Sequence, residues 1–151
     1  MYHTKKGASY DFRTAYFKND FLRSRQPGAH LDEKTLFITE AAAIVHDIGI
    51  RLCLEKYGDG NGKLQEKEGP ALAEQMLSEL GFERDVIERV SFLVGHHHTY
   101  TGIDGLDYQI LVEADFLVNL FEGNTDTAHI RATYDNIFRT ETGKKICREM
   151  F

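Results

Sequence analysis

Apolar residues recur at intervals of three and four along most of this chain, and glycine-bearing turns separate the segments that show this spacing. The spacing places apolar side chains on one face of an α-helix. Period-two alternation and hairpin dipeptides, which are typical of strands, are scarce. The pattern predicts an all-α protein, and we expect a single compact bundle of about six or seven helices.

The chain is expected to form one domain over residues 1–151. Within it, 1–30 is an atypical N-terminal segment, 31–121 is the core and 122–151 supplies C-terminal helices. Asp32 is a plausible N-cap and Gly49 and Gly81 are plausible helix stops. Helices are expected over 33–48, 67–80, 84–95 and 107–121, from Thr125 or Asp126 onward, and over 141–151, with a loop at 56–63.

Composition narrows the classes of partner and compartment. The net charge is −6 and Lys and Arg form no block, which argues against duplex nucleic acid or an anionic membrane as the main partner. The start of the chain lacks an apolar signal core, and no segment approaches the roughly 20 apolar residues of a membrane span. Cys53 and Cys147 fit no zinc motif and need no disulfide. We therefore expect a cytoplasmic protein in a reducing compartment.

One carboxylate falls on the apolar stripe of the helix expected at 107–121. Asp115 lies four residues after Leu111 and three before Val118, so its side chain points to the buried face. A buried carboxylate needs a cation, a metal or strong donors. A hydrogen-bond or Arg partner within the core would satisfy it as well as a metal would.

Two further segments carry metal-ligand side chains at the ends of expected helices. His46 and Asp47 are adjacent in the last turn of 33–48, behind small alanines that allow a neighbouring helix to approach. In GHHHT, His97 follows the apolar face of 84–95, His98 lies beside it, and His96 falls nearer the outer side. Imidazole and carboxylate together suit divalent transition metals or Mn²⁺. A solvated helix end is the alternative for each segment taken alone.

Together, AAAIVHDIGI (41–50), GHHHTY (95–100) and ILVEADFLV (110–118) resemble the HD-domain metal-dependent phosphohydrolases. The resemblance implies the HD-type helical bundle, with His46, Asp47 and Asp115 as metal ligands. It also implies that His97 and His98, or His96 if the register shifts by one, hold a second metal or the substrate phosphate. In such enzymes the metal polarises a phosphate oxygen and acidifies a bound water, which attacks phosphorus. Asp47 would orient or deprotonate that water.

The sequence departs from the family at one ligand. HD proteins place another His on the preceding helix, but no His occurs between His3 and His30. If residues 32–46 are helical, His30 lies roughly 20 Å or more from His46. A one-nucleotide frameshift within residues 13–24 of the source gene is one hypothesis for this absence, because a shifted reading can supply a His near Ala15.

The expected function is hydrolysis of a small phosphorylated substrate, a phosphomonoester or a nucleotide, dependent on a divalent ion such as Mn, Fe, Co, Ni, Zn or Mg. The alternatives are a catalytically impaired HD-like domain that binds metal or nucleotide or mediates association, and a purely structural bundle. Glu66 and Glu68 lie near the start of the helix expected at 67–80, where the helix dipole alone favours acidic residues. Substrate, metal identity and oligomeric state stay open.

Overall fold

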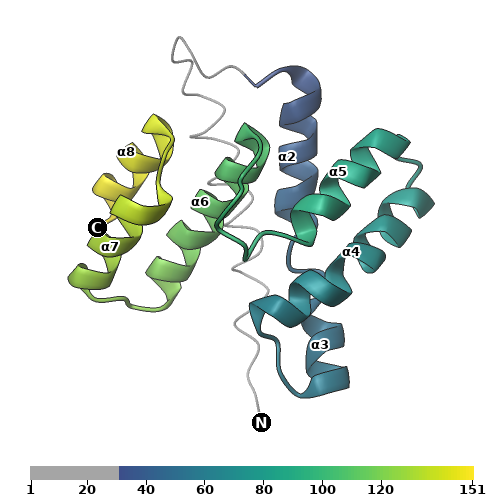
Figure 1. Cartoon of the computed structure of the whole chain (residues 1–151), viewed down its shortest axis with the longest axis horizontal. Helices are drawn as coiled ribbons and strands as arrows, with labels where there is room; N and C mark the ends of the chain where they lie inside the picture. The colour runs from purple at the N-terminus through teal and green to yellow at the C-terminus, as the bar shows by residue number, and fades with distance from the viewer. Residues whose placement is uncertain (1–30) are drawn as a thin grey trace. The chain divides into compact units, whose positions relative to one another are not determined.

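The part of the chain that the structure describes, residues 31–151 of a computed structural model, is helical and contains no strand. This confirms the all-α class (Figure 1). The helices are α2 (Glu33–Val45), α3 (Ile50–Tyr57), α4 (Gly62–Glu79), α5 (Arg84–Val94), α6 (Leu106–Glu122), α7 (Thr127–Ile137) and α8 (Glu141–Met150). None of these helices combines the length and the hydropathy that crossing a membrane requires.

Helix starts follow the capping residues of the sequence. The side chain of Asp32 accepts the N–H of Thr35 at 2.9 Å and begins α2, and Asp126 begins α7 in the same way. A carboxylate at this position satisfies a backbone donor that has no partner within the helix. Asp32 was predicted as an N-cap, and Asp126 was one of the two residues at which the later helix was expected to start.

Three boundaries differ from the prediction. Helix α2 ends at Val45 rather than at residue 48, and the separate helix α3 follows it. The loop expected at 56–63 shortens to four residues, because α3 continues to Tyr57 and α4 begins at Gly62. Gly58, at φ +69°, adopts the left-handed conformation that ends α3. A short helix of eight residues has too few apolar positions to show a clear period.

The apolar face of α2 also differs from the expected one. Phe37, Ala41, Ile44 and Ile48 have the helical spacing that predicts a shared apolar face, but Phe37 and Ile44 are 48 % and 42 % exposed. The buried face instead carries Ile38, Thr39, Ala41, Ala42 and Val45. Small side chains form most of this face, so hydropathy alone gave the wrong register.

The described residues fall into two compact units, Leu31–Val112 and Glu113–Phe151, and the boundary lies inside α6. In the first unit, α4 packs against α5, α2 packs against α5, and α3 packs against α4 (Figure 1). Two glycines permit close contacts with α4. A Cβ on Gly49 would lie 3.1 Å from Gly69 Cα, and a Cβ on Gly69 would lie 2.8 Å from Val94. Helix α4 is therefore held against both the α2–α3 turn and the end of α5.

The second unit has its own apolar cluster of Leu117, Phe138, Ile146 and Cys147. Beside it, the buried carboxylate of Glu113 accepts the backbone N–H groups of Arg139 at 2.6 Å and Thr140 at 2.9 Å, and also the Thr140 hydroxyl. These donors lie at the start of α8. An acidic group there stabilises the helix through its unsatisfied N–H groups and its dipole.

Candidate metal centre

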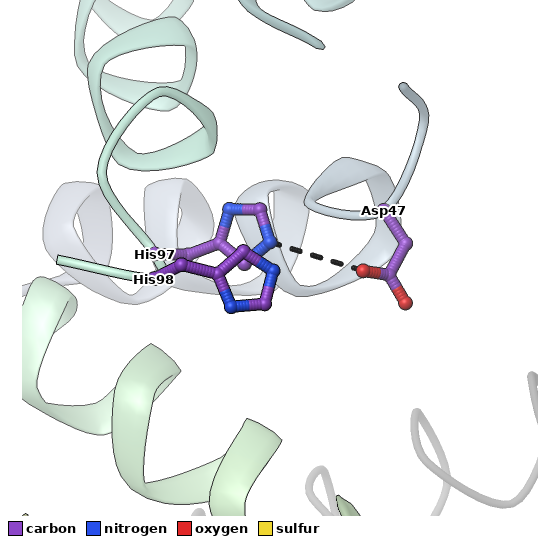
Figure 2. A group of neighbouring side chains, drawn as sticks. All are labelled: Asp47, His97 and His98. Atoms are coloured by element: carbon purple, nitrogen blue, oxygen red, sulfur yellow. Dashed lines mark ion pairs between the residues drawn. The ribbon is translucent and has the colours of Figure 1, made fainter. Parts of the chain in front are cut away.

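Three side chains that can bind a metal converge within the unit Leu31–Val112. Asp47, His97 and His98 each offer one ligand atom, and these atoms all lie within 4.8 Å of one another. Figure 2 shows the two imidazole rings side by side and directed toward the Asp47 carboxylate, with His97 Nε2 3.8 Å from Asp47 Oδ1. His97 is fully buried, whereas Asp47 and His98 are partly exposed. The group thus has a buried side and a more accessible one.

Asp47 lies in the turn between α2 and α3. The sequence placed Asp47 in the last turn of a longer helix, but the backbone after Val45 forms a tighter turn with hydrogen bonds between residues three apart. The N–H of Ile48 donates to the Val45 carbonyl at 2.9 Å, and the N–H of Ile50 donates to the Asp47 carbonyl at 3.0 Å. These hydrogen bonds join residues three apart, as in a 3₁₀ turn, and so the backbone leaves the α-helical conformation. Asp47 is thereby presented on a turn that Gly49 holds against α4.

His97 and His98 lie in the turn that follows α5. The helix ends at Val94, and the N–H of Thr99 donates to the His96 carbonyl at 2.7 Å. The spacing along α5 predicted that His97 would continue the buried face, and its side chain is fully buried. The prediction for His97 is therefore confirmed at the level of burial, although the backbone there is a turn.

The hydrogen bond of His97 determines which of its nitrogens can bind a cation. Nδ1 lies 2.8 Å from the carbonyl oxygen of Val94. A carbonyl only accepts, so Nδ1 carries the proton, and the lone pair of the neutral ring is on Nε2. That nitrogen faces Asp47 Oδ1. Histidines that bind metals are commonly oriented by this kind of bond from the other ring nitrogen.

His46 adjoins the group and has the same orientation device. Its Nδ1 lies 3.0 Å from the Ala43 carbonyl, which assigns the proton to Nδ1. Its Nε2 lies 3.5 Å from Asp47 Oδ2, and its ring meets the His97 ring edge-on at 5.2 Å between centroids. His46 is buried. His46 therefore approaches Asp47 Oδ2, whereas His97 approaches Asp47 Oδ1, and His46 is a neighbour of the three converging side chains.

The first turns of α4 meet His98. Glu66 Oε1 accepts the backbone N–H of His98 at 3.0 Å and the hydroxyl of Thr99 at 2.9 Å. Gly62 packs so close to the ring that a Cβ there would lie 2.6 Å from His98 Cγ. The interpretation of Glu66 as only a helix-dipole residue is thus incomplete, because it fixes the turn that carries two candidate ligands. Glu68 instead binds Lys56 and Tyr57 at the surface.

His96 does not belong to the converging group in the described structure. Its ring stacks on Phe92 with 4.0 Å between centroids, and its Nδ1 lies 2.7 Å from the Phe92 carbonyl. The sequence placed His96 nearer the outer side of α5, and the stacking on the half-exposed Phe92 agrees with this.

Two groups hold the 95–105 connection in place. Tyr108 Oη lies within hydrogen-bond distance of the carbonyl oxygens of His96, at 2.7 Å, and Thr99. Burial raises the pKa of Tyr108 to about 12, so the hydroxyl keeps the proton that it donates. At the other end, Arg89 of α5 binds Asp107 and Asp104 with two pairs of N–H···O contacts of 2.7 to 3.1 Å. These ion pairs raise the pKa of Arg89.

Asp115 lies in the other unit. Its side chain is buried, as the stripe of α6 predicted, and it accepts a hydrogen bond from Asn119 Nδ2 at 2.9 Å. Its role as a metal ligand stays a prediction. The position expected for the family's first His, together with His3, His30 and the frameshift hypothesis, lies outside the described residues.

The donor set of the converging group fits a divalent ion. Two imidazoles and a carboxylate combine intermediate and hard ligands, which suits Mn, Fe, Co, Ni and Zn. Nitrogen and oxygen ligands lie about 2.0 to 2.2 Å from such ions, so an ion could be reached by atoms that lie within 4.8 Å of one another after small rotations. Comparison with known protein families, curated proteins and solved structures finds no match to this chain.

Three contributors to the site were missed or undervalued in the sequence: Gln65, Glu66 and Tyr108. Each acts through a contact with the 96–99 turn from a distant part of the chain. Periodicity describes one helix at a time and carries no signal for such contacts. Gln65 also fell between the loop expected at 56–63 and the helix expected at 67–80, so its burial in α4 had no local signal.

Proposed function

We propose that this protein is a divalent-metal-dependent phosphohydrolase whose metal is held by Asp47, His97 and His98, with His46 as a further ligand; the assignment of Asp115 as a ligand stays a prediction from the sequence. The observation that carries the proposal is the convergence of Asp47, from the α2–α3 turn, with two histidines about fifty residues later. The order of these residues in the chain is the order of the HD-type motifs that the sequence resembles.

The proposed reaction is the hydrolysis of a small phosphomonoester or nucleotide. A bound divalent ion would supply a Lewis acid for the phosphate oxygens and lower the pKa of a water molecule. Asp47 is the catalytic candidate, because its carboxylate lies at the group and is partly exposed. From there it can orient an attacking water or take its proton. The partly exposed His98 is a candidate donor to the substrate phosphate, and His96 is a more distant one.

A cytoplasmic location is part of the proposal. Both cysteines are free thiols and buried in the structure, which supports a protein that works without disulfides. No duplex nucleic acid or membrane partner is proposed.

The first test is the metal content of untagged protein, measured by elemental analysis beside the variants Asp47→Ala and His97→Ala. We expect about one divalent ion per chain in the wild type and loss of most of it in both variants. Asp135→Ala and His129→Ala are matched controls, because both residues are exposed on α7. These controls keep the metal content of the wild type.

The second test is hydrolysis of p-nitrophenyl phosphate and nucleoside monophosphates after reloading with Mn²⁺ or Co²⁺. Metal binding with turnover that is lost in Asp47→Ala supports the hydrolase. Metal binding without turnover of any phosphate ester supports the impaired HD-like domain instead. Absence of metal from the wild type after reloading contradicts the hydrolase and leaves an HD-like domain that binds nucleotide or mediates association, or a purely structural bundle.

A further inference from the structure

Gln65 presents its amide oxygen to His98. The side chain is buried in the first turns of α4, and its Nε2 lies 2.6 Å from the carbonyl oxygen of Gly60. That carbonyl only accepts, so the amide nitrogen must face Gly60. The amide oxygen is therefore the atom that lies 3.4 Å from His98 Nε2. The loop before α4 thus fixes which end of the amide is offered to the histidine.

The distance between these two atoms suits co-ligands of one ion. Two atoms that bind an ion at about 2.1 Å lie roughly 3.0 Å apart at right angles and roughly 3.4 Å apart in a tetrahedron. A hydrogen bond from ring N–H to an amide oxygen is usually about 2.9 to 3.0 Å. The observed 3.4 Å between His98 Nε2 and the Gln65 oxygen is closer to the separation of two ligands of one ion than to the length of a hydrogen bond.

The other ring nitrogen of His98 has its own neighbour. An ion bound at Nε2 would take the lone pair of that nitrogen and leave the ring proton on Nδ1, and the hydroxyl oxygen of Tyr100, 3.5 Å away, lies on that side of the ring. With the proton on Nδ1, the lone pair of His98 is on Nε2, beside the Gln65 oxygen. Both atoms are then acceptors, and a shared cation makes their approach favourable.

We propose that Gln65 is a further ligand of the metal, through its amide oxygen, alongside Asp47, His97 and His98. This inference rests on the metal site of the proposed function and extends its ligand set. An amide oxygen adds a hard donor and no charge, so it shifts preference toward ions that accept oxygen readily, such as Mn²⁺, over softer ones. Helix α4 then contributes both a ligand and, through Glu66, the fixation of the His98 main chain.

The test is titration of untagged, metal-free protein with Co²⁺, followed by visible absorption, and with Mn²⁺, followed by calorimetry. Gln65→Met removes the oxygen and keeps nearly the same volume. We expect it to weaken binding of both ions by about tenfold or more, and to change the intensity of the Co²⁺ bands, which reports coordination number. Gln75→Met is the matched control on the same helix, because Gln75 is exposed and binds only Glu79 among the contacts described. It binds both ions as the wild type does.

Gln65→Glu provides a second reading at the same position. It keeps an oxygen on the His98 side and adds charge, but it loses the donor to the Gly60 carbonyl, so we expect it to bind Mn²⁺ more tightly than Gln65→Met does. Wild-type affinity and an unchanged Co²⁺ spectrum in Gln65→Met overturn the assignment of Gln65 alone. Mn²⁺ binding in Gln65→Glu that is no tighter than in Gln65→Met also overturns it. A wild type that binds neither ion overturns both this inference and the proposed function.

Discussion

Glu66 Oε1 lies 3.0 Å from the backbone nitrogen of His98, so a side chain of α4 fixes the main chain of the turn that carries two candidate ligands. The same oxygen accepts the Thr99 hydroxyl at 2.9 Å. Glu66→Ala removes the acceptor of both the His98 N–H and the Thr99 hydroxyl. We expect a loss of about 1 to 3 kcal/mol in the free energy of unfolding, measured with urea, and weaker Co²⁺ binding.

Glu74→Ala is the control for this variant. Glu74 is exposed on the same helix and its one described partner, Arg84, is 3.7 Å away. Such a surface pair contributes about 0 to 1 kcal/mol. Equal unfolding free energies for Glu66→Ala and Glu74→Ala would show that Glu66 does not hold the turn.

Gly62 leaves space for the His98 ring. Because a Cβ at this position would lie 2.6 Å from His98 Cγ, Gly62→Ala must displace the ring. Alanine is more favourable than glycine in a helix by up to about 1 kcal/mol. This gain in helix stability offsets part of the steric cost of displacing the ring, so the free energy of unfolding changes little. We expect metal affinity to fall by about tenfold while the unfolding free energy stays within about 1 kcal/mol of the wild type.

The neighbouring Gly60→Ala separates this steric effect from a general effect of stiffening the loop. A Cβ on Gly60 would meet Leu54 at 3.6 Å and Ile50 at 3.8 Å, which are ordinary van der Waals contacts. Its metal affinity should equal that of the wild type. The hypothesis fails if Gly60→Ala and Gly62→Ala weaken binding alike.

Tyr108 makes stability depend on alkaline pH. Burial raises its pKa from 10.0 to about 12 in the folded protein. The unfolded chain therefore loses the proton first, and the stability contributed by the neutral hydroxyl is present below pH 10 and is lost as the pH rises toward 12. At about 1.4 kcal/mol per pKa unit, the full loss is on the order of 3 kcal/mol.

The measurement is urea unfolding at pH 9 and pH 11.5 for the wild type and Tyr108→Phe. The phenylalanine variant is less stable at pH 9, because the carbonyl groups of His96 and Thr99 lose a donor. The advantage of the wild type should shrink at pH 11.5. An advantage that is independent of pH would mean that Tyr108 titrates alike in the folded and unfolded chain.

Arg89 holds a buried carboxylate, and its removal should be costly. Asp107 is only 5 % exposed and receives two N–H groups from Arg89. Arg89→Ala leaves this charge without its guanidinium, so we expect a loss of about 3 kcal/mol in the free energy of unfolding. Arg89→Lys recovers only part of it, because an ammonium cannot make the paired contacts.

Arg84 begins the same helix and serves as the comparison. It pairs with Glu88 at the exposed surface, four residues along α5. Arg84→Ala should cost no more than about 0.5 kcal/mol. Thermal unfolding of the three arginine variants side by side orders these effects, and a loss in Arg89→Ala as small as that in Arg84→Ala would contradict the buried-pair argument.

How far the sequence predicts this structure depends on how local the signal is. The burial of His97 follows from the strong apolar period of α5, and the starts of α2 and α7 follow from Asp32 and Asp126. These features depend on residues within one or two turns of each other. The all-α class follows for the same reason.

The features that the sequence does not predict are those that depend on packing between helices. The end of α2 at Val45 accompanies the contact of Gly49 with Gly69, about twenty residues along the chain. The contacts of Gln65 and Glu66 with His98 span more than thirty residues. Hydropathy reports whether a side chain is buried, and it does not report what that side chain meets.

The protons on Nδ1 of His46 and His97 are both donated to main-chain carbonyls three residues earlier in the chain. Many metal-binding histidines are instead oriented by a carboxylate, which adds a negative charge behind each ring. Here two backbone carbonyl groups orient the rings, and a carbonyl carries no net charge. Any anion at the group would consequently meet less repulsion from behind these two rings than it would from a pair of carboxylates, and the tautomer with its lone pair on Nε2 forms when the two turns fold.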